Sequence, residues 1–321
     1  MTLSVKQEAG PLPHKTRSTP NRINGDFPMN LLQRAVYFGF NIVEELRPQP
    51  TLSDVIPFRI EASAYPGDCL ARTASPSRIL SNLFWLGLPV EAIEAALGTV
   101  RIVDVGCGKG GYAKLFAKRF GTMESYLGID VERRDAWDRH STRDPRCRFV
   151  AAPAESITDE VLGDATLIVS QSALEHFPED LTFAGKVGGW AASADRPILQ
   201  LHILPGPKNW RQYGTHGFRG YTKRALAGLI DAFQPRDHRV FVLGGKACNE
   251  VHYRWIYDRL NRSVRDRRAA DTDAYSTALA TALADDAARL NDSVDDACFL
   301  VLATMHGDGE LLPALQRHMA P

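Results

Sequence analysis

Residues 102–111 read IVDVGCGKGG, an apolar run that ends in closely spaced glycines. Such a run predicts a buried β-strand that turns into a ligand-binding loop. Glycines suit that loop because a backbone that turns sharply and lies against a ligand has no room for Cβ atoms. Residues 112–119 resume with helical spacing, so we expect the loop to open a helix N-terminus, where backbone N–H groups are available to a ligand.

Two classes of ligand use this strand, loop and helix. Gly106, Gly108 and Gly111 satisfy the dinucleotide pattern G-x-G-x-x-G. Asp104, Gly106, Gly108 and Gly110 satisfy D-x-G-x-G-x-G, and here the sequence resembles the class I S-adenosylmethionine-dependent methyltransferases. Asp104 favours the second class, because a carboxylate inside the strand would repel the pyrophosphate of a dinucleotide.

The resemblance implies which residues hold S-adenosyl-L-methionine, with S-adenosylhomocysteine as the product. Asp104 would help to hold the methionine amino group, and the loop from Gly106 to Gly110 would leave room for the nucleoside. The other cofactor-binding candidates lie in that loop or directly after later strands, at the same edge of the sheet. They are Cys107 and Gly108 in the loop, Asp130 for the ribose hydroxyls, Ala154 and Glu155 beside the adenine, and Ser170 and Gln171 between methyl donor and acceptor.

Strand-like and helix-like segments alternate after residue 100, which predicts an α/β fold with right-handed crossovers. The resemblance implies a Rossmann-like three-layer sandwich whose sheet has seven strands in the order 3-2-1-4-5-7-6, mostly parallel with an antiparallel last strand. The expected strands are 101–105, 126–131, 148–152, 166–170, 197–204, 239–243 and 298–305.

The chain divides into three parts. Residues 1–28 contain few apolar side chains and are expected to form a disordered tail. Residues 29–89 are expected to form an N-terminal helical cap, with one helix over 30–47 and another that begins at Ser75 and Pro76. Residues 90–321 are expected to form the cofactor-binding domain, which begins with a short helix over 90–97. It has a helical insertion at 245–297, with helices over 251–262 and 274–290.

The segment after the fourth predicted strand, residues 170–180, reads SQSALEHFPED. It lacks the D/N-P-P-Y/F motif of amino-methylating enzymes and the Pro-Cys nucleophile of cytosine C5 enzymes, and it resembles the L-E-H segment of small-molecule methyltransferases. Because a sulfonium already carries an activated methyl group, catalysis needs alignment and removal of the acceptor's proton. We therefore expect His176 to be the general base, with His216 as the second catalytic candidate; packing against the next helix is the alternative role of His176.

Part of the sequence also resembles metal-dependent relatives, the small-RNA 2′-O-methyltransferases and the ubiquinone-pathway O-methyltransferases. Those enzymes have E-x-x-E-H after strand four and H-x-F-x-W-T/S-x-R after strand five. Glu175 and His176 match the end of the first motif and residues 216–224 resemble the second, but Ser172 replaces the first glutamate. One carboxylate and two imidazoles are a thin shell for a hard cation, so we expect no metal.

Composition limits the partners. The formal net charge is zero, which disfavours nucleic acid as a partner. The five cysteines are dispersed and residues 1–29 lack a signal-peptide core, so we expect reduced thiols and a soluble, cytoplasmic protein without a membrane span.

The sequence therefore predicts a methyltransferase that methylates a hydroxyl of a small molecule or glycan. Acceptor contacts are expected from the N-terminal helices and from residues 204–221, which include Lys208, Asn209, Trp210, Arg211 and Tyr213. Three alternatives stay open: an NAD(P)-dependent oxidoreductase, an RNA 2′-O-methyltransferase and a non-catalytic cofactor-binding protein.

Overall fold

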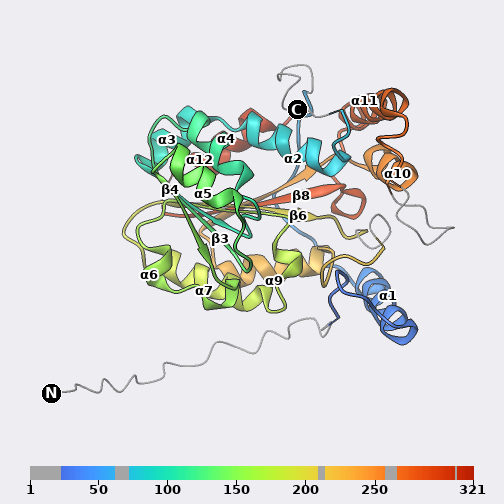
Figure 1. Cartoon of the computed structure of the whole chain (residues 1–321), viewed down its shortest axis with the longest axis horizontal. Helices are drawn as coiled ribbons and strands as arrows, with labels where there is room; N and C mark the ends of the chain where they lie inside the picture. Colours follow the sequence, from blue (N-terminus) through green and yellow to red (C-terminus); the bar gives the residue numbers. More distant parts are fainter. Residues whose placement is uncertain (1–22, 62–71, 209–213, 257–265, 308) are drawn as a thin grey trace.

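A computed structural model describes residues 23–61, 72–208, 214–256, 266–307 and 309–321. An eight-stranded sheet lies between two layers of helices (Figure 1). The fold is therefore the expected α/β three-layer sandwich. Within the described residues, the strands in chain order are β1 Val55–Pro57, β2 Val100–Val105, β3 Met123–Asp130, β4 Cys147–Ala151, β5 Leu167–Gln171, β6 Ile198–Pro205, β7 Asp237–Leu243 and β8 Phe299–His306.

The strand order across the sheet is β1-β7-β8-β6-β5-β2-β3-β4. Strand β8 runs antiparallel to β6 and β7, and the other pairs are parallel. This confirms the predicted order and the antiparallel last strand. The expectation of seven strands was wrong, because β1 adds an eighth by pairing with β7, with Val55 opposite Val240. Three residues are too few to show an alternating pattern, so the sequence did not reveal β1.

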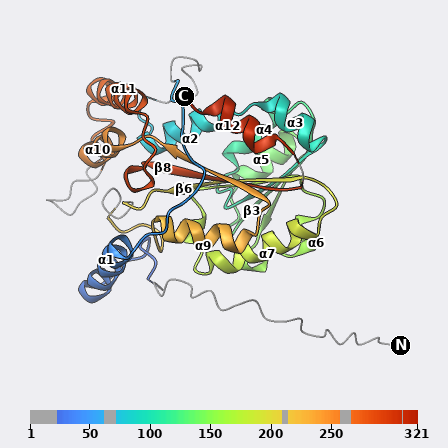
Figure 2. The ribbon, with the colours of Figure 1, turned by 180° about the vertical axis from the view of Figure 1, so that it is seen from behind.

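Helices cover both faces of the sheet (Figures 1 and 2). Helices α2, α3, α4, α5 and α12 lie on one face, and α6, α7 and α9 lie on the other. The described α-helices are α1 Leu31–Leu46, α2 Pro76–Gly87, α3 Val90–Leu97, α4 Gly111–Arg119, α5 Ala136–Arg143, α6 Asp159–Leu162, α7 Asp180–Ser193, α9 Lys223–Phe233, α10 Lys246–Trp255, α11 Thr272–Arg289 and α12 Leu311–Met319. Helix α12 was not predicted from the sequence.

Side chains of the central strands alternate between two hydrophobic cores. In β2, Val100 and Ile102 pack into the core under α2, α3 and α4, whereas Val103 and Val105 pack into the core over α6, α7 and α9. Because both faces are covered, the central strands are almost entirely apolar. Asp104 is an exception inside β2, and it is buried.

The region expected to be a helical cap is mixed, since it contains β1 as well as α1 and α2. Helix α1, which was predicted over 30–47, begins after the capping residue Asn30, but much of its apolar side is exposed: Leu31 and Leu46 are each 78% exposed. Tyr37 is fully buried and attaches the helix to the body. Among the described residues no single helix is long and apolar enough to cross a membrane; α2 and α3 pass such a test only as a pair, bent by 61°.

The cysteines that the structure describes, Cys107, Cys147, Cys248 and Cys298, are free thiols, as predicted. Cys69 lies outside the described residues.

A buried carboxylate joins the two helices of the insertion, α10 and α11. Asp286 of α11 accepts hydrogen bonds from the N–H groups of Gly245 (2.7 Å), Ala247 (3.1 Å) and Cys248 (2.9 Å), at the start of α10. Helix α10 has no side-chain cap of its own, so Asp286 takes that role from a neighbouring helix.

Replacing this carboxylate is expected to destabilise the protein. Asp286→Ala should lower the free energy of unfolding by about 2–4 kcal/mol, because three N–H groups, two of them buried, lose their acceptor. Chemical denaturation measures the change. Asp285→Ala is the matched control, since Asp285 is exposed on the same helix and should cost well under 1 kcal/mol. Equal stability of the two variants would contradict this role for Asp286.

Candidate active site

The glycine loop after β2 is packed tightly at two points and open at a third. Gly106 has a φ of 77°, and a Cβ on it would lie 2.3 Å from the Cβ of Ala173. Gly110 has a φ of 73° and would place a Cβ 2.5 Å from the ring of Phe149. A Cβ on Gly108 would meet no described atom within 4 Å. The backbone at Gly108 therefore borders open space, as a ligand-binding loop requires.

Asp104 lies at the carboxyl end of β2, with only 3% of its surface exposed. Its carboxylate accepts a 2.5 Å hydrogen bond from the hydroxyl of Tyr126. Burial raises the pKa of Asp104 to about 7; the hydrogen bond from Tyr126 opposes the rise, and the nearby charge of Asp130 adds to it. Its charge therefore changes near neutral pH.

Asp130, at the end of β3, fixes the shape of the same loop. Its carboxylate accepts a 2.8 Å hydrogen bond from the N–H of Gly108, and the indole N–H of Trp137 donates to the carbonyl of Gly108 at 2.8 Å. Cys107 is 9% exposed, and burial raises the pKa of its thiol far above the ordinary value, so it is not a reactive thiolate.

The remaining cofactor-binding candidates differ in what their side chains can reach. Ala154 and Glu155 form a short 3₁₀ turn after β4, at the expected sheet edge. The Ser170 hydroxyl is fully buried and pairs with His202 Nδ1 at 2.8 Å, so it cannot meet a ligand. Gln171 accepts a 2.6 Å hydrogen bond from the indole of Trp85.

Three segments that are distant in sequence meet beside this loop: residues 23–28, 172–179 and 214–221. The N–H of Gly25 donates to the carbonyl of Gly217 at 2.6 Å, and the N–H of Phe218 donates to the carbonyl of Glu175 at 2.7 Å. Residues 23–28 were expected to belong to a disordered tail, and here they are bonded to the body instead. Residues 1–22 lie outside the described residues.

Asp26 bridges the two predicted catalytic histidines. Its Oδ2 lies 2.6 Å from His176 Nδ1, its Oδ1 lies 3.1 Å from His216 Nδ1, and the imidazole centroids are 4.7 Å apart. Although burial opposes ionisation, hydrogen bonds with both histidines hold the pKa of Asp26 well below its usual range. The pKa of His176 is raised: burial lowers it, but Asp26 and Glu175 outweigh that effect.

Glu175 lies near the Nε2 atoms of the two histidines, whereas Asp26 contacts their Nδ1 atoms. It is 0% exposed, and neither carboxylate oxygen has a hydrogen-bond partner among the described residues. Its Oε1 lies 3.8 Å from His176 Nε2 and 3.9 Å from His216 Nε2. Burial raises the pKa of Glu175 against the lowering effect of the two histidines. We call Asp26, Glu175, His176 and His216 the acid–histidine cluster.

The cluster is held next to the glycine loop. Ala173, which packs on Gly106, precedes Glu175 by two residues, and Asp130 is close enough to raise the pKa of His176. Tyr37 donates from its hydroxyl to the carbonyl of His216 at 2.8 Å. Gly217 must be a glycine, because its φ is 56° and a Cβ would lie 2.6 Å from the carbonyl oxygen of Glu175.

The loop that contains His216 is anchored by a buried ion pair. Arg219 pairs with Asp180, and the hydroxyl of Tyr221 donates to the same carboxylate at 3.1 Å. Of the acceptor candidates in this loop, Lys208 is engaged by Asp296 at 2.8 Å. Residues 209–213 lie outside the described residues.

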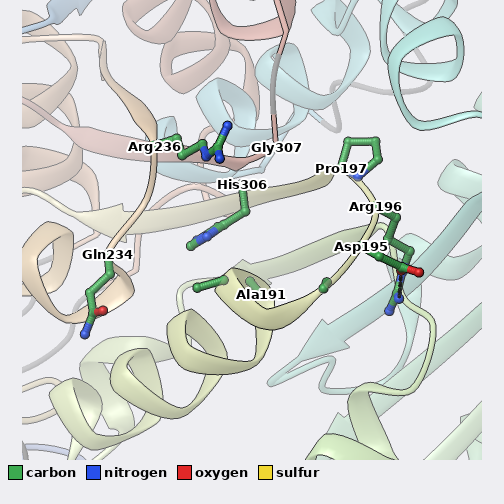
Figure 3. Close-up of a pocket in the computed structure, with 10 residues that line it drawn as sticks. Ala191, Asp195, Arg196, Pro197, Gln234, Arg236, His306 and Gly307 are labelled. Atoms are coloured by element: carbon green, nitrogen blue, oxygen red, sulfur yellow. Dashed lines mark ion pairs between the residues drawn. The ribbon is translucent and has the colours of Figure 1, made fainter.

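A cavity of about 360 Å³ lies elsewhere (Figure 3). It is lined by Pro197, Arg236, His306 and Gly307, among others. Pro197 and Arg236 precede β6 and β7, so this cavity is at the amino ends of the parallel strands, opposite the glycine loop. It is therefore separate from the candidate active site.

Comparison with known protein families gives a match for the central segment of the chain. Residues 102–185 match the family model described as a methyltransferase domain. No curated protein matches the sequence.

Several solved structures are similar, all at low sequence identity. A 1,6-didemethyltoxoflavin-N1-methyltransferase from Burkholderia thailandensis is 13% identical, over 88% of this chain and 93% of that chain, with a TM-score of 0.40. A SAM dependent methyltransferase from Archaeoglobus fulgidus is 13% identical, over 72% and 95%, with a TM-score of 0.41. The cyclase SpnF is 14% identical, over 86% and 96%, with a TM-score of 0.44.

The bridge between the histidines can be tested by titration. In Asp26→Asn the pKa of His176 is expected to fall, because the amide has no charge to favour the imidazolium. NMR titration of the histidine ring protons measures it. Asp231→Asn, which changes an exposed carboxylate on α9, should leave the titration unchanged. A His176 pKa that is the same in Asp26→Asn and wild type would exclude the bridge in solution.

The matched segment begins in β2 and ends in α7, so it contains the glycine loop, Asp130 and the Glu175–His176 pair. The match therefore includes the loop for which the sequence predicts cofactor binding. Over residues 102–185 the chain is therefore similar to a methyltransferase domain.

Proposed function

We propose that this enzyme transfers the methyl group of S-adenosyl-L-methionine to a hydroxyl oxygen of a small molecule or glycan. The observation on which the acceptor chemistry rests is the acid–histidine cluster beside the glycine loop. A hydroxyl must lose its proton to become a good nucleophile, and imidazoles oriented by carboxylates are suited to accept that proton.

The cofactor residues follow from the loop geometry. S-adenosyl-L-methionine supplies an activated methyl group on its sulfonium. We assign the open space at Gly108 to the nucleoside, and the free lone pairs of Asp104 and Asp130 to the methionine ammonium and the ribose hydroxyls respectively. Ala154 and Glu155 would border the adenine, and Gln171 the methionine portion; for Ser170 only the backbone is available, since its hydroxyl is bonded to His202.

In this proposal the two histidines act on the molecule that accepts the methyl group. Asp26 is ionised at neutral pH and accepts only, so each Nδ1 that is bonded to it is a donor. In the neutral imidazoles the basic nitrogen is then Nε2, on the side of Glu175. We assign proton removal from the acceptor hydroxyl to one of these Nε2 atoms, with Asp26 stabilising the imidazolium that forms.

The acceptor can be identified directly. Extracts are incubated with the enzyme and an isotopically labelled methyl donor, and mass spectrometry finds the labelled product. A label on a hydroxyl oxygen of a small metabolite or glycan supports the proposal. A label on nitrogen, carbon or RNA contradicts it, and stabilisation by NAD but not by S-adenosylhomocysteine would overturn the assignment of the cofactor site itself.

Affinity for S-adenosylhomocysteine is expected to depend on the charge of Asp104. Because the pKa of Asp104 is about 7, its carboxylate is lost as the pH falls through 7, and with it the ion pair to the ligand's ammonium. The dissociation constant should rise by up to ~10-fold per pH unit below 7. Asp104→Asn should bind ~10–100-fold more weakly at pH 8 with little pH dependence. Calorimetry at several pH values measures both, and an affinity in Asp104→Asn equal to wild type contradicts the role.

The two histidines should affect turnover and not cofactor binding. His176→Gln and His216→Gln are each expected to lower kcat by ~10²–10⁴-fold, with the affinity for S-adenosylhomocysteine unchanged. Initial rates with the labelled donor measure this. His318→Gln is the control, because His318 is exposed on α12, far from the cluster in sequence and on a different element. Full activity of both histidine variants would show that neither histidine is the general base.

A further inference from the structure

We propose that helix α1 pairs with the same helix of a second copy of this chain, so that the protein forms a dimer through an antiparallel helix–helix contact. The helix attaches to its own protomer through one side only. Its buried residues are Tyr37 and Asn41, which lie about one turn apart. The rest of the helix stands at the edge of the molecule in both views (Figures 1 and 2). The inference does not rest on the proposed function.

The side of α1 that faces away from Tyr37 and Asn41 is apolar and exposed. Ten large hydrophobic side chains are exposed among the described residues, and six of them lie on this helix. At about 100° per residue, these six point within about 80° of the direction of Gly39, opposite the buried side. Together with Ala35 and Gly39 they form a surface that we call the α1 strip: Leu31, Leu32, Ala35, Val36, Gly39, Ile42, Val43 and Leu46. Monomeric proteins rarely leave such a continuous apolar surface uncovered, so the strip is a contact surface.

The α1 strip is symmetric about Gly39. Apolar residues lie at equal distances on either side of it, at the spacings of three, four and seven that share one helix face. The pairs are Val36 with Ile42, Ala35 with Val43, and Leu32 with Leu46. A twofold axis at Gly39 would place each member opposite its counterpart in the other copy, which is what a contact between identical surfaces requires. This self-complementarity favours a second copy over an unrelated partner.

Gly39 lets the two helices approach each other. A Cβ on Gly39 would meet no described atom within 4 Å, and its φ is not positive, so its own protomer does not require a glycine there. Glycine inside a helix is destabilising relative to alanine. Where two helices cross, however, the distance between their axes depends on the side chains at the contact. Gly39 at the centre of the strip therefore permits a close crossing.

The charges beside the α1 strip favour the antiparallel direction. Arg34, in the first half of the helix, and Glu45, in its last turn, lie along the same border of the strip. An antiparallel pair centred on Gly39 brings Arg34 of each copy next to Glu45 of the other, whereas a parallel pair would place like charges together. Arg34 is the one basic residue in Leu31–Leu46, which disfavours a membrane surface as the occupant, because helices that lie on membranes are rich in Lys and Arg.

The size of the contact sets its expected strength. The 16 residues of α1 form a helix about 24 Å long. One side of such a helix buries less than the ~800 Å² per partner of a standard interface. We therefore expect a weak dimer, with a dissociation constant on the order of 10–100 μM.

Sedimentation velocity of the full chain, from about 1 to 500 μM, tests the pairing. The mass should rise with concentration from 35.5 kDa towards twice that value. Gly39→Arg should weaken association by ~100-fold or more, because it puts two like charges at the point where the helices cross. Its new side chain meets open space in its own protomer, so the variant should fold. Gly189→Arg is the matched control: Gly189 is an exposed helical glycine in α7 with the same open space, and this variant should associate like wild type.

Disulfide cross-linking tests the direction of the helices. Residue 32 of one copy should lie opposite residue 46 of the other, so a mixture of Leu32→Cys and Leu46→Cys chains should form a mixed disulfide under oxidation. Neither variant should cross-link efficiently with itself, and wild type is the control for its own cysteines. Efficient cross-linking of Leu32→Cys with itself would show parallel helices and contradict the arrangement.

Two further results would overturn the proposal. One is a monomer at every concentration; the other is a dimer that Gly39→Arg, shown by circular dichroism to be folded, leaves intact. Vesicles of phosphatidylcholine and phosphatidylserine test the membrane: co-sedimentation of wild type that Leu32→Glu abolishes would assign the α1 strip to a lipid surface instead. These measurements use no methyl donor, so their failure leaves the proposed function standing.

Discussion

The structure depends on the contact between two turns at the carboxyl edge of the sheet. Between Gly106 and Ala173 there is no room for another Cβ. Since β2 and β5 are parallel neighbours, the turns that follow them meet at this edge, and the missing side chain lets them touch. The glycine loop and the segment of Glu175 and His176 are thereby fixed against each other. Under the proposed function, this contact would give the methyl donor and the acceptor a common, rigid support.

Electrostatics at this edge differs on the two sides of the contact. On the side of the glycine loop, Asp104 is shielded from water, and this burial raises the pKa of its carboxyl to about 7. On the other side, Asp26 stays charged because two imidazoles bond to it. The pKa of an aspartate is therefore raised at one position of this site and lowered at another. The difference comes from the hydrogen-bond partners and not from burial alone.

Much of the fold could be predicted from the sequence, but only part of the site. The strands from β2 onward follow from apolar runs bounded by turns, and Gly106, Asp104 and Asp130 follow from a local motif with fixed spacing. Asp26 could not be predicted: it lies 150 residues before His176 in a segment without periodicity. The burial of Glu175 was equally hidden, because it arises from Gly217 and Phe218, which approach from another loop.

The short strand β1 closes one border of the sheet. The carbonyl of Asp54 and the N–H of Phe58 both form hydrogen bonds with β7. Because backbone groups of successive residues point to opposite sides of a strand, the backbone nitrogen and carbonyl of Pro57 point away from β7. Proline has no N–H to offer on that outer side. An extended segment of another molecule could not form a complete ladder of hydrogen bonds with β1. This edge of the sheet is thus protected from the edge-to-edge pairing that begins aggregation.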